Sequence, residues 1–483
     1  MHRKFLTNLG LMLFVNILIK PFWILGIDRS VQNVVGPVDY GFYYAVFNFS
    51  FLFNILLDFG ITNFNNRNIS QNNHLLNKHF SGIVAIKFIL AGIYMVITLS
   101  AGLIWGYDSR QMFILLILGI NQFLISFILY LRSNISGLLL FKTDSFVSVL
   151  DRVLMILICS VLLWGNITST VFRIEWFVYA QTSAYLLTAL VAVLIVARKA
   201  SFSRLKWDKL FFLMIIKKSF PFAILGLLMT FYNRIDSVMM ERMLPGNLGD
   251  LQTGIYAMAY RLLDASNMIA YLFAVLLLPI FARMIKLGES VQGILRLAFT
   301  LLFTISVVAS TASFFYSFEI MDLLYDHHVT EASFVFRLLM IDFVAVSATY
   351  VFGTLLTANG SLKIMNILAS AGMLINIALN LYFIPRFMAQ GAAVASLVTQ
   401  FVIALAQVLI VVKSFHFIPD LRYLIKLLGF VSGVILISYL SRFLPFDWKV
   451  SFVALLIVSA LLAFLSGLLN IRSLLRQFGQ PVP

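Results

Sequence analysis

Charged residues are scarce in this chain, and acidic ones are scarcer than basic ones. Only 11% of the 483 residues are charged, with 20 Asp+Glu against 35 Lys+Arg, and the only cysteine is Cys159. The low charge excludes disordered tails and most soluble enzymes, because soluble domains average about 25% charged residues. A single cysteine excludes a disulfide scaffold. The surplus of +15 does not indicate a nucleic-acid partner, because too little polar surface remains to form a basic, water-soluble face.

Apolar side chains are abundant instead, at 61% of the chain, and the mean hydropathy is +0.98. Apolar stretches of about 20 residues recur, each long enough to cross about 30 Å of hydrocarbon as a helix. Runs such as 113–118 do not alternate as barrel strands do. The sequence therefore predicts an all-α integral membrane protein with about 14 transmembrane helices. These spans are 7–25, 40–59, 80–103, 111–131, 145–164, 176–197, 219–240, 254–280, 293–315, 334–358, 361–384, 388–412, 420–441 and 449–469.

The distribution of basic residues between loops predicts the orientation. With the N-terminus inside, the inner segments hold 22 Lys and Arg and the outer segments hold seven. Cytoplasmic loops carry this excess in membrane proteins, so we expect a multi-pass protein with both termini in the cytoplasm. The first span starts with basic residues, as a signal peptide does. No small-residue cleavage site follows it, so we expect the span to remain.

Two weak internal matches indicate parallel repeats. Residues 39–43 (DYGFY) resemble 252–256 (QTGIY) at an offset of 213, and 137–139 resemble 354–356 at an offset of 217. Six predicted helices separate the members of each pair, so both members have the same orientation. The predicted domains are an N-terminal six-helix bundle (1–197), a basic cytoplasmic linker (198–218), a C-terminal six-helix bundle (219–412), and two further helices with a cytoplasmic tail (413–483).

Eleven ionisable residues fall inside the predicted helices. Each costs about 2.5–3.5 kcal/mol at the helix centre on the insertion scale, so we expect these residues to pair, to snorkel, or to line a wet cavity. The basic ones are Lys20, Lys87, Arg152, Arg234, Arg261 and Arg337, and the acidic ones are Asp58, Asp151, Asp236, Asp264 and Asp342.

Lys20 and Arg234 are the best candidates for a central anion site. Lys20 has no acid within a helical turn, and Arg234 is two residues from Asp236, a spacing at which helical side chains point apart. The repeat offset of 213 places Lys20 opposite Asn233, next to Arg234, so the two halves carry a cation at nearly equivalent positions. A cavity-lining role and an interhelical salt bridge both remain open for these two residues.

For the other charged residues we expect different environments. Arg261 and Asp264 are three residues apart and should pair on one helix face, whereas the adjacent Asp151 and Arg152 should point apart. Lys87 and Arg152 lie roughly 10 Å from the cytoplasmic side and either line a cavity or snorkel toward that face. Asp58 is expected at the interface. No metal site is predicted, because the adjacent loop residues His327 and His328 are a poor ligand set.

Four strings resemble those of a known family: 36–43 (GPVDYGFY), 231–236 (FYNRID), 253–262 (TGIYAMAYRL) and 391–396 (GAAVAS). The chain resembles bacterial polysaccharide biosynthesis flippases, the O-antigen and repeat-unit translocases of the superfamily that includes multidrug extruders and the peptidoglycan-precursor flippase. The likeness covers nearly the whole chain. It implies two bundles that alternate access and move an undecaprenyl-pyrophosphate-linked oligosaccharide to the periplasmic leaflet of the bacterial inner membrane.

The resemblance also implies roles for the buried charges. Cavity-lining cations of the family are carried onto Lys20, Arg234 and Arg261, with Lys87 and Arg152 as further candidates. Acids that couple transport to H+ or Na+, or pair with the cations, would be Asp236, Asp264, Asp151 and Asp342. No cofactor and no nucleic acid are expected. The implied partners are membrane lipid, the lipid-linked glycan, and the polysaccharide polymerase with its chain-length machinery.

Two other interpretations stay open. A cation-coupled multidrug exporter of the same fold would use acids such as Asp236 or Asp264, but the buried charges include one more base than acid. A membrane polysaccharide polymerase would be an enzyme and would need long loops with catalytic groups, whereas the longest outer connection, 316–333, has no compelling catalytic pattern. Aromatic and amide side chains such as Tyr43, Asn48 and Tyr256 either contact sugars or serve ordinary packing.

Overall fold

The computed structural model describes residues 18–62 apart from 20, residues 65, 66 and 69, and then 75–138, 140–165, 172–199, 209–417 and 420–469. All regular elements in these parts are helical, which confirms the all-α prediction. Ten of the described helices are long and apolar enough to cross a membrane. The chain is a multi-span membrane protein.

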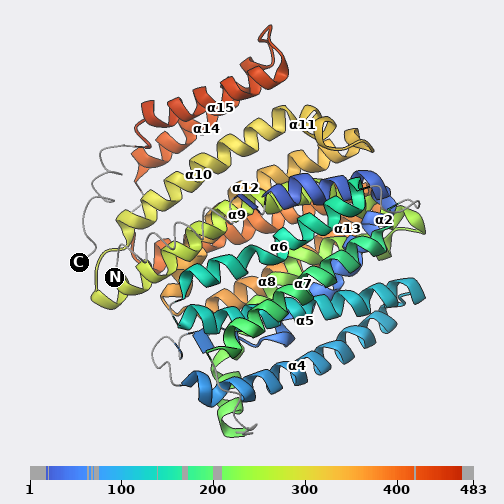
Figure 1. Cartoon of the computed structure of the whole chain (residues 1–483). Coiled ribbons are helices and arrows are strands. Elements are labelled where there is room, and N and C mark those ends of the chain that lie inside the picture. The colour runs from blue at the N-terminus through green and yellow to red at the C-terminus, as the bar shows by residue number, and fades with distance from the viewer. Residues whose placement is uncertain are drawn as a thin grey trace. The chain divides into compact units, whose positions relative to one another are not determined.

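The helices follow the predicted spans closely. The span 7–25 lies mostly outside the described residues, and each of the other predicted spans falls on a described helix. In chain order the elements are η1 (Trp23–Asp28), α2 (Arg29–Leu52), η2 (Asn54–Leu57), α4 (Leu75–Trp105), α5 (Ser109–Gly137), α6 (Phe141–Trp164), α7 (Ile174–Ala197), α8 (Lys209–Met243), α9 (Asn247–Leu287), α10 (Gln292–Phe315), α11 (Ser317–Leu324), α12 (Val329–Ala358), α13 (Leu362–Ser414), α14 (Leu421–Ser441) and α15 (Trp448–Leu465) (Figure 1).

The chain forms two compact units, which divide within α9. The first covers Met1–Ala257 and the second Met258–Pro483. The division into bundles that the sequence indicates, with a linker at 198–218, stays a prediction, and residues 200–208 of that linker lie outside the described residues.

In the first unit, α2 packs against α5, α7 and α8, and α5 packs against α4 and α7. Two local signals set the helix ends. Asp108 caps α5 in a capping box, in which its side chain accepts from the Gln111 N–H at 2.7 Å. Gly36 has φ 80° and kinks α2, and Pro37 follows it with the fixed φ suited to a first helical turn. The apparent boundary at Gly36-Pro37 is therefore a kink, and α2 begins earlier than the predicted residue 40.

In the second unit, α12 packs against both α10 and α13, and α14 and α15 pack against each other and against α10 (Figure 1). The long α13 holds two predicted spans. Its backbone departs from helical geometry at Met388, three residues after Pro385, and this kink separates 361–384 from 388–412.

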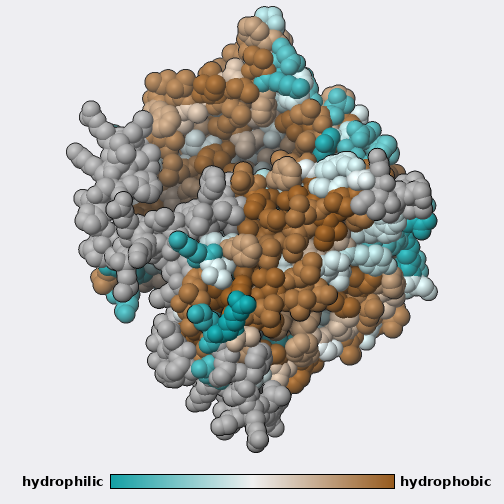
Figure 2. All heavy atoms as spheres, viewed as in Figure 1, coloured by the Kyte–Doolittle hydropathy of each residue, from teal (hydrophilic) through white to brown (hydrophobic). Residues whose placement is uncertain are grey.

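The described surface carries many large apolar side chains. Ile104 is 87% exposed, Leu421 70% and Leu428 67%, and apolar side chains cover much of the face seen in Figure 2. An apolar surface of this extent is unusual on a soluble monomer. It is the surface that lipid chains cover in a membrane protein.

Candidate translocation site

Arg234 lies on α8 in the first unit, in the string FYNRID. Its guanidinium carbon is 5.7 Å from the centre of the Phe51 ring on α2, which is a cation–π distance. The side chain is half-buried. The next turn of α8 is fixed to α2 because the Asn48 amide donates to the Ser237 hydroxyl at 2.8 Å. Arg234 is therefore held beside an aromatic ring at the contact of α2 with α8, with part of its surface exposed.

Asp236 follows on the same helix but is buried, with 1% of its surface exposed. The Tyr256 hydroxyl of α9 donates to its carboxylate at 2.9 Å. A buried acid keeps its charge only where hydrogen bonds or opposite charges offset the lost hydration. Asp236 is thus a carboxylate in the interior of the first unit, and its state depends on the groups around it.

Arg152, on α6, lies among aromatic side chains. Its guanidinium carbon is 5.8 Å from the Trp23 ring centre, and its Nη1 donates to the Tyr185 hydroxyl at 3.4 Å. Its Nε is 3.8 Å from the Asp151 carboxylate. The expectation that Asp151 and Arg152 point apart is therefore wrong. The long arginine side chain folds back far enough to reach the carboxylate of the preceding residue.

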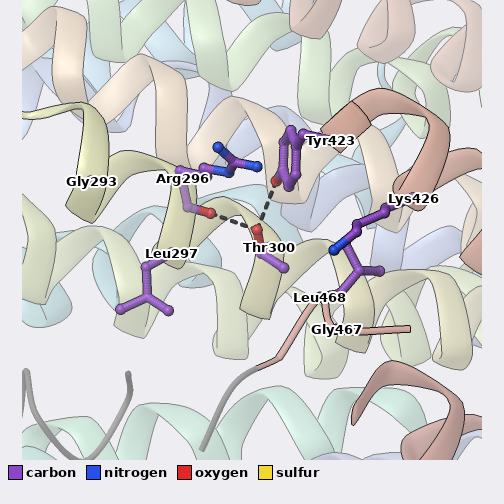
Figure 3. A pocket seen from close by; sticks show the side chains of 8 residues that line it. All are labelled: Gly293, Arg296, Leu297, Thr300, Tyr423, Lys426, Gly467 and Leu468. Atoms are coloured by element: carbon purple, nitrogen blue, oxygen red, sulfur yellow. Dashed lines mark hydrogen bonds between the residues drawn. The ribbon is translucent and has the colours of Figure 1, made fainter. Parts of the chain in front are cut away.

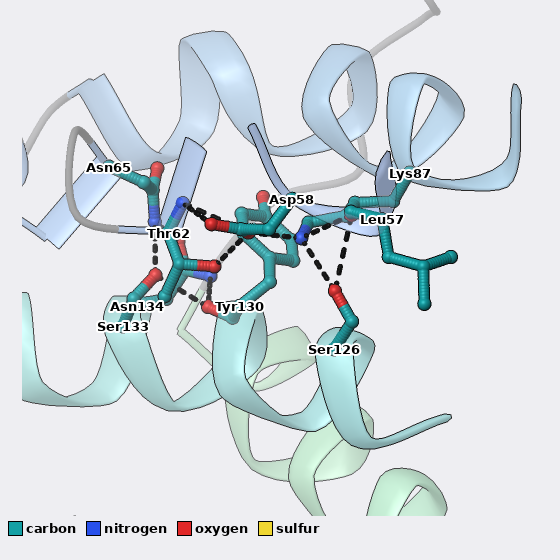
Figure 4. Close-up of polar contacts among 9 residues, drawn as sticks. All are labelled: Leu57, Asp58, Thr62, Asn65, Lys87, Ser126, Tyr130, Ser133 and Asn134. Carbon is teal, nitrogen blue, oxygen red and sulfur yellow. Dashed lines mark hydrogen bonds and ion pairs between the residues drawn. The ribbon is translucent and has the colours of Figure 1, made fainter. Parts of the chain in front are cut away.

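Lys87, on α4, is completely buried. Its ammonium group forms an ion pair with Asp58 and donates to the Leu57 carbonyl and to the Ser126 hydroxyl, both at 3.0 Å (Figure 4). Thr62 also donates to Asp58. All three ammonium donors are directed to groups within the first unit, so of the two alternatives left open for Lys87, snorkelling is excluded. Lys87 instead fixes the chain where α2 ends and η2 passes into the turn at Asp58.

The second unit contains four of the predicted charges, two basic and two acidic. Arg261 and Asp264 on α9 are 4.0 Å apart, so the predicted ion pair is confirmed. Asp342 on α12 is buried, with 1% of its surface exposed, and accepts from the Ser396 hydroxyl of α13 at 3.0 Å. The Ser396 hydroxyl comes from the GAAVAS string, so this string connects α13 to a buried acid.

The remaining predicted groups are Arg337, whose Nε donates to the Ser317 hydroxyl at 2.5 Å, two packing tyrosines and one undescribed cation. Tyr43 and Tyr256 are each 1% exposed, and Tyr43 accepts from the Gln181 amide at 2.9 Å, so both serve packing between helices. Lys20 lies outside the described residues.

Asp28 is a buried acid that was not singled out from the sequence. It is 1% exposed, and both its oxygens accept from the Tyr40 hydroxyl at 2.9 Å. Asp28 ends η1, in the stretch between two predicted spans, whereas Tyr40 lies on α2, so helical periodicity gave no signal for their contact. Gln32 donates to Asp28 one turn on, at 3.2 Å.

The structure therefore divides the described candidate cations into those that serve packing or pair with an acid on the same helix face and those that lie partly exposed beside aromatic rings. Lys87 is part of the packing of the first unit, and Arg261 has an acid one turn away. Arg234 and Arg152 are partly exposed and lie beside the aromatic rings of Phe51 and Trp23. A guanidinium group has five donors in a planar fork, which suits the oxygens of a phosphate group.

Comparison with known families decides the class of the chain. The family described as "Polysaccharide biosynthesis protein" matches residues 8–285. The chain belongs to this family. The five cations proposed for the cavity lie in the matched part, as do the acids Asp151, Asp236 and Asp264, whereas Arg337 and Asp342 lie beyond it.

Solved structures show the fold of this polysaccharide biosynthesis protein. It is similar to the lipid II flippase MurJ in an inward closed conformation, with a TM-score of 0.70 and 14% identity over 98% of this chain and 100% of that one. It is also similar to an inward-facing multidrug resistance MATE transporter of the MOP superfamily (TM-score 0.60, 14% identity, 84% and 98% covered). A third similar structure is a MOP superfamily transporter from Pyrococcus furiosus, which is reported to have a binding pocket of reverse polarity. Its TM-score is 0.59 and its identity 14%, over 85% of this chain and 94% of that one.

No curated protein sequence matches this family member. The solved structures that share its fold are a lipid flippase and transporters. The fold matches include both lipid flippases and drug transporters, so the substrate has to be argued from the site.

Proposed function

We propose that this polysaccharide biosynthesis protein is a flippase that moves an undecaprenyl-pyrophosphate-linked oligosaccharide from the cytoplasmic to the periplasmic leaflet of a bacterial inner membrane. The family match supports a polysaccharide precursor as cargo. The similarity to MurJ along 98% of the chain supports a lipid-linked one. The protein would alternate access to a central basic cavity, with both termini in the cytoplasm.

The main structural support for this proposal is Arg234, which is suited to bind the pyrophosphate. A pyrophosphate is a strong anion, and a guanidinium group binds phosphate oxygens in pairs. Arg234 combines a position within a membrane helix, partial exposure and an aromatic neighbour, Phe51, against which the guanidinium stacks. Arg152 has the same combination with Trp23. Lys20 and Arg261 would complete the anion site, and the sugars would cross beside it while the prenyl chain stays in lipid.

The energy source is proposed to be a gradient of H+ or Na+ acting through a buried carboxylate. Asp151 and Asp264 lie near arginines, at 3.8 and 4.0 Å. Asp236 and Asp342 are the two most buried of the four, at 1% exposure each, and both accept hydrogen bonds from hydroxyl groups. The ionisation of such buried acids responds most strongly to a cation or proton entering the site. The polymerase and its chain-length machinery would consume the delivered unit.

Transport by purified protein tests this function. Protein reconstituted into vesicles with an undecaprenyl-pyrophosphate-linked oligosaccharide should move the sugar to the outer leaflet, where an added glycosidase can cleave it. The variant R234A should lose this activity, and R386Q, a change at an exposed arginine outside the predicted spans, should keep it. Export of a cationic drug with no movement of the lipid-linked sugar would contradict the flippase and favour the multidrug exporter.

A further inference from the structure

A basic cavity lies in the second unit, and its lining consists of residues not considered so far. It encloses about 210 Å3, far more than the roughly 30 Å3 that one water molecule occupies. It is formed at the start of α10, the start of α14 and the turn that follows α15 (Figure 3). The lining residues are Gly293, Arg296, Leu297, Thr300, Tyr423, Lys426, Gly467 and Leu468.

The cavity is positively charged. Its lining holds two cations, Arg296 and Lys426, and no acid. One carboxylate stands beside it, because Asp420 lies 3.0 Å from the Arg296 guanidinium. The backbone N–H of Tyr423 and the neighbouring Arg296 hold the pKa of Asp420 below its usual range, so this carboxylate stays ionised at neutral pH. The three side chains together therefore carry one net positive charge.

Two hydroxyl groups hold the Tyr423 ring, which supports one of the cations. The Thr300 hydroxyl donates to the Arg296 carbonyl at 2.7 Å, so the Tyr423 hydroxyl, 2.7 Å from the Thr300 oxygen, must be the donor of that second bond. The Tyr423 ring also supports the Arg296 guanidinium, whose carbon is 4.1 Å from the ring centre. Both hydroxyl hydrogens are used within the protein. The donors that face a ligand are therefore those of the cations.

Lys426 supplies the second cation. It forms no ion pair or hydrogen bond within the described parts of the chain, and its ammonium group lies close to Gly467, in the turn after α15. Figure 3 shows this ammonium directed across the cavity toward α10. Two donors of opposite helices, Arg296 and Lys426, thus face the same space.

The outer edge of the cavity is apolar. Leu297 and Leu468 line it, and Leu465, at the end of α15 two residues before Gly467, is 85% exposed. These leucines offer an apolar surface next to the two cations. A lipid can place its headgroup in the cavity and its acyl chains against this surface.

We propose that this cavity binds the phosphate of an anionic membrane lipid, with Lys426 and Arg296 contacting the phosphate oxygens and the acyl chains lying against the leucines at its edge. Basic pockets at the ends of membrane helices recognise lipid phosphates in this way. One net positive charge matches a phosphodiester with a single negative charge better than a pyrophosphate. The lipid proposed for this cavity is therefore a different ligand from the lipid-linked sugar of the proposed transport. The predicted topology places it in the cytoplasmic leaflet.

Native mass spectrometry of the full chain in detergent tests the site. Phosphatidylglycerol should bind the wild-type protein, and K426Q and R296Q should each weaken binding about fivefold, which corresponds to about 1 kcal/mol per surface charge. K363Q is the matched control, because Lys363 is an exposed lysine at the start of another helix of the same unit, and it should bind as the wild type does. The proposal would be overturned if K363Q lost as much phosphatidylglycerol binding as the site variants do, or if K426Q and R296Q lost none.

Two further binding measurements distinguish the possible ligands of the cavity. Zwitterionic phosphatidylcholine should bind more weakly than phosphatidylglycerol, and equal binding would show that the charge plays no part. Inorganic phosphate in excess should leave phosphatidylglycerol bound, and its displacement would assign the cavity to a free anion. Melting temperatures without lipid should be equal for all variants, because Lys426 is exposed. The lipid readout does not depend on transport, so it can fail while the flippase proposal holds.

Discussion

Gly41 and Gly254 face each other's helices in a reciprocal contact. A Cβ atom on Gly41 would lie 1.8 Å from the carbonyl oxygen of residue 250, and a Cβ atom on Gly254 would lie 1.9 Å from that of Pro37. The two contacts are related by the offset of 213 residues that relates the two QTGIY-like strings, since 37 corresponds to 250 and 41 to 254. A pair of equivalent segments that touch through equivalent atoms has the form of a two-fold contact.

Substitution of either glycine by alanine should disturb this contact strongly. Each added methyl group would meet a backbone carbonyl, which cannot move aside as a side chain can, and overpacking of this kind costs about 1–3 kcal/mol or more. We expect G41A and G254A to lower the melting temperature in detergent. G92A is the control, because a Cβ there meets nothing within 4 Å. Wild-type stability of both variants would show that α2 and α9 do not cross so closely.

The Lys87–Asp58 pair should be required for stability rather than for substrate binding. K87M removes the partner of a largely buried carboxylate and the donor to Leu57 and Ser126, and breaking such a pair costs about 3–5 kcal/mol. The variant should therefore melt earlier in the absence of any substrate. The double variant K87M/D58N should recover part of this loss, because no charge is then left without its counterpart.

The opposite result would restore Lys87 as a substrate-binding residue. If K87M melts like the wild type but no longer moves the lipid-linked sugar, the ammonium group acts on the cargo. Differential scanning fluorimetry and the vesicle assay on the same preparations distinguish the two cases.

Most of the helical architecture is predictable from the sequence because lipid imposes one strong rule. A helix that crosses hydrocarbon has to be apolar for about 20 residues, and each span shows such an apolar run in the sequence. Kinks within a helix are harder to predict. Gly36-Pro37 reads as a boundary although α2 continues through it, because a glycine–proline pair fits both a loop and a kink.

Pairing of the buried charges is much less predictable. Helical periodicity correctly pairs Arg261 with Asp264, since both lie on one helix. It fails for Lys87, whose partner Asp58 comes from a turn between elements. It also fails for Arg152, because its side chain is long enough to reach the adjacent Asp151. Contacts between helices depend on packing, and one sequence does not specify that packing.

Arg234 should be needed for transport and not for folding. R234A removes the guanidinium but leaves Tyr232 and Asp236 in place, so protein level and melting temperature should change little. A hydrogen bond to a charged group contributes about 1.5–3 kcal/mol, so the rate of sugar movement should fall at least about tenfold. R234K should retain part of the activity, because an ammonium group keeps the charge but not the planar fork. Full transport by R234A would exclude this residue from the anion site.

Asp236 should determine whether transport depends on an ion gradient. D236N keeps an oxygen that accepts from Tyr256 and removes the charge. Vesicles with an imposed H+ or Na+ gradient should accelerate the wild type but not D236N. D342N tests the other deeply buried acid in the same assay. A wild-type gradient response in both variants would place the coupling group elsewhere.

Asp420 should restrain the lipid site by partly neutralising Arg296. It also caps α14, because its carboxylate accepts from the Tyr423 N–H at 3.2 Å. D420N separates these two roles, since asparagine caps helices about as well as aspartate does. The net charge of the three side chains rises from one to two, so phosphatidylglycerol should bind about fivefold more tightly.

Two comparisons check the assignment to Asp420. D447N changes an exposed aspartate at the start of α15, the end of that helix opposite Gly467, and should leave lipid binding unchanged. In the wild type, the pKa of Asp420 lies below the usual value of about 3.9. Its carboxylate therefore stays charged as the pH falls from neutral toward that value, and the affinity for phosphatidylglycerol should stay constant over this range. The affinity should rise only when more acidic solution protonates Asp420 and leaves the Arg296 charge uncompensated, and D420N should not show this rise. Weaker binding by D420N would mean that the carboxylate positions Arg296 for the phosphate instead of competing with it.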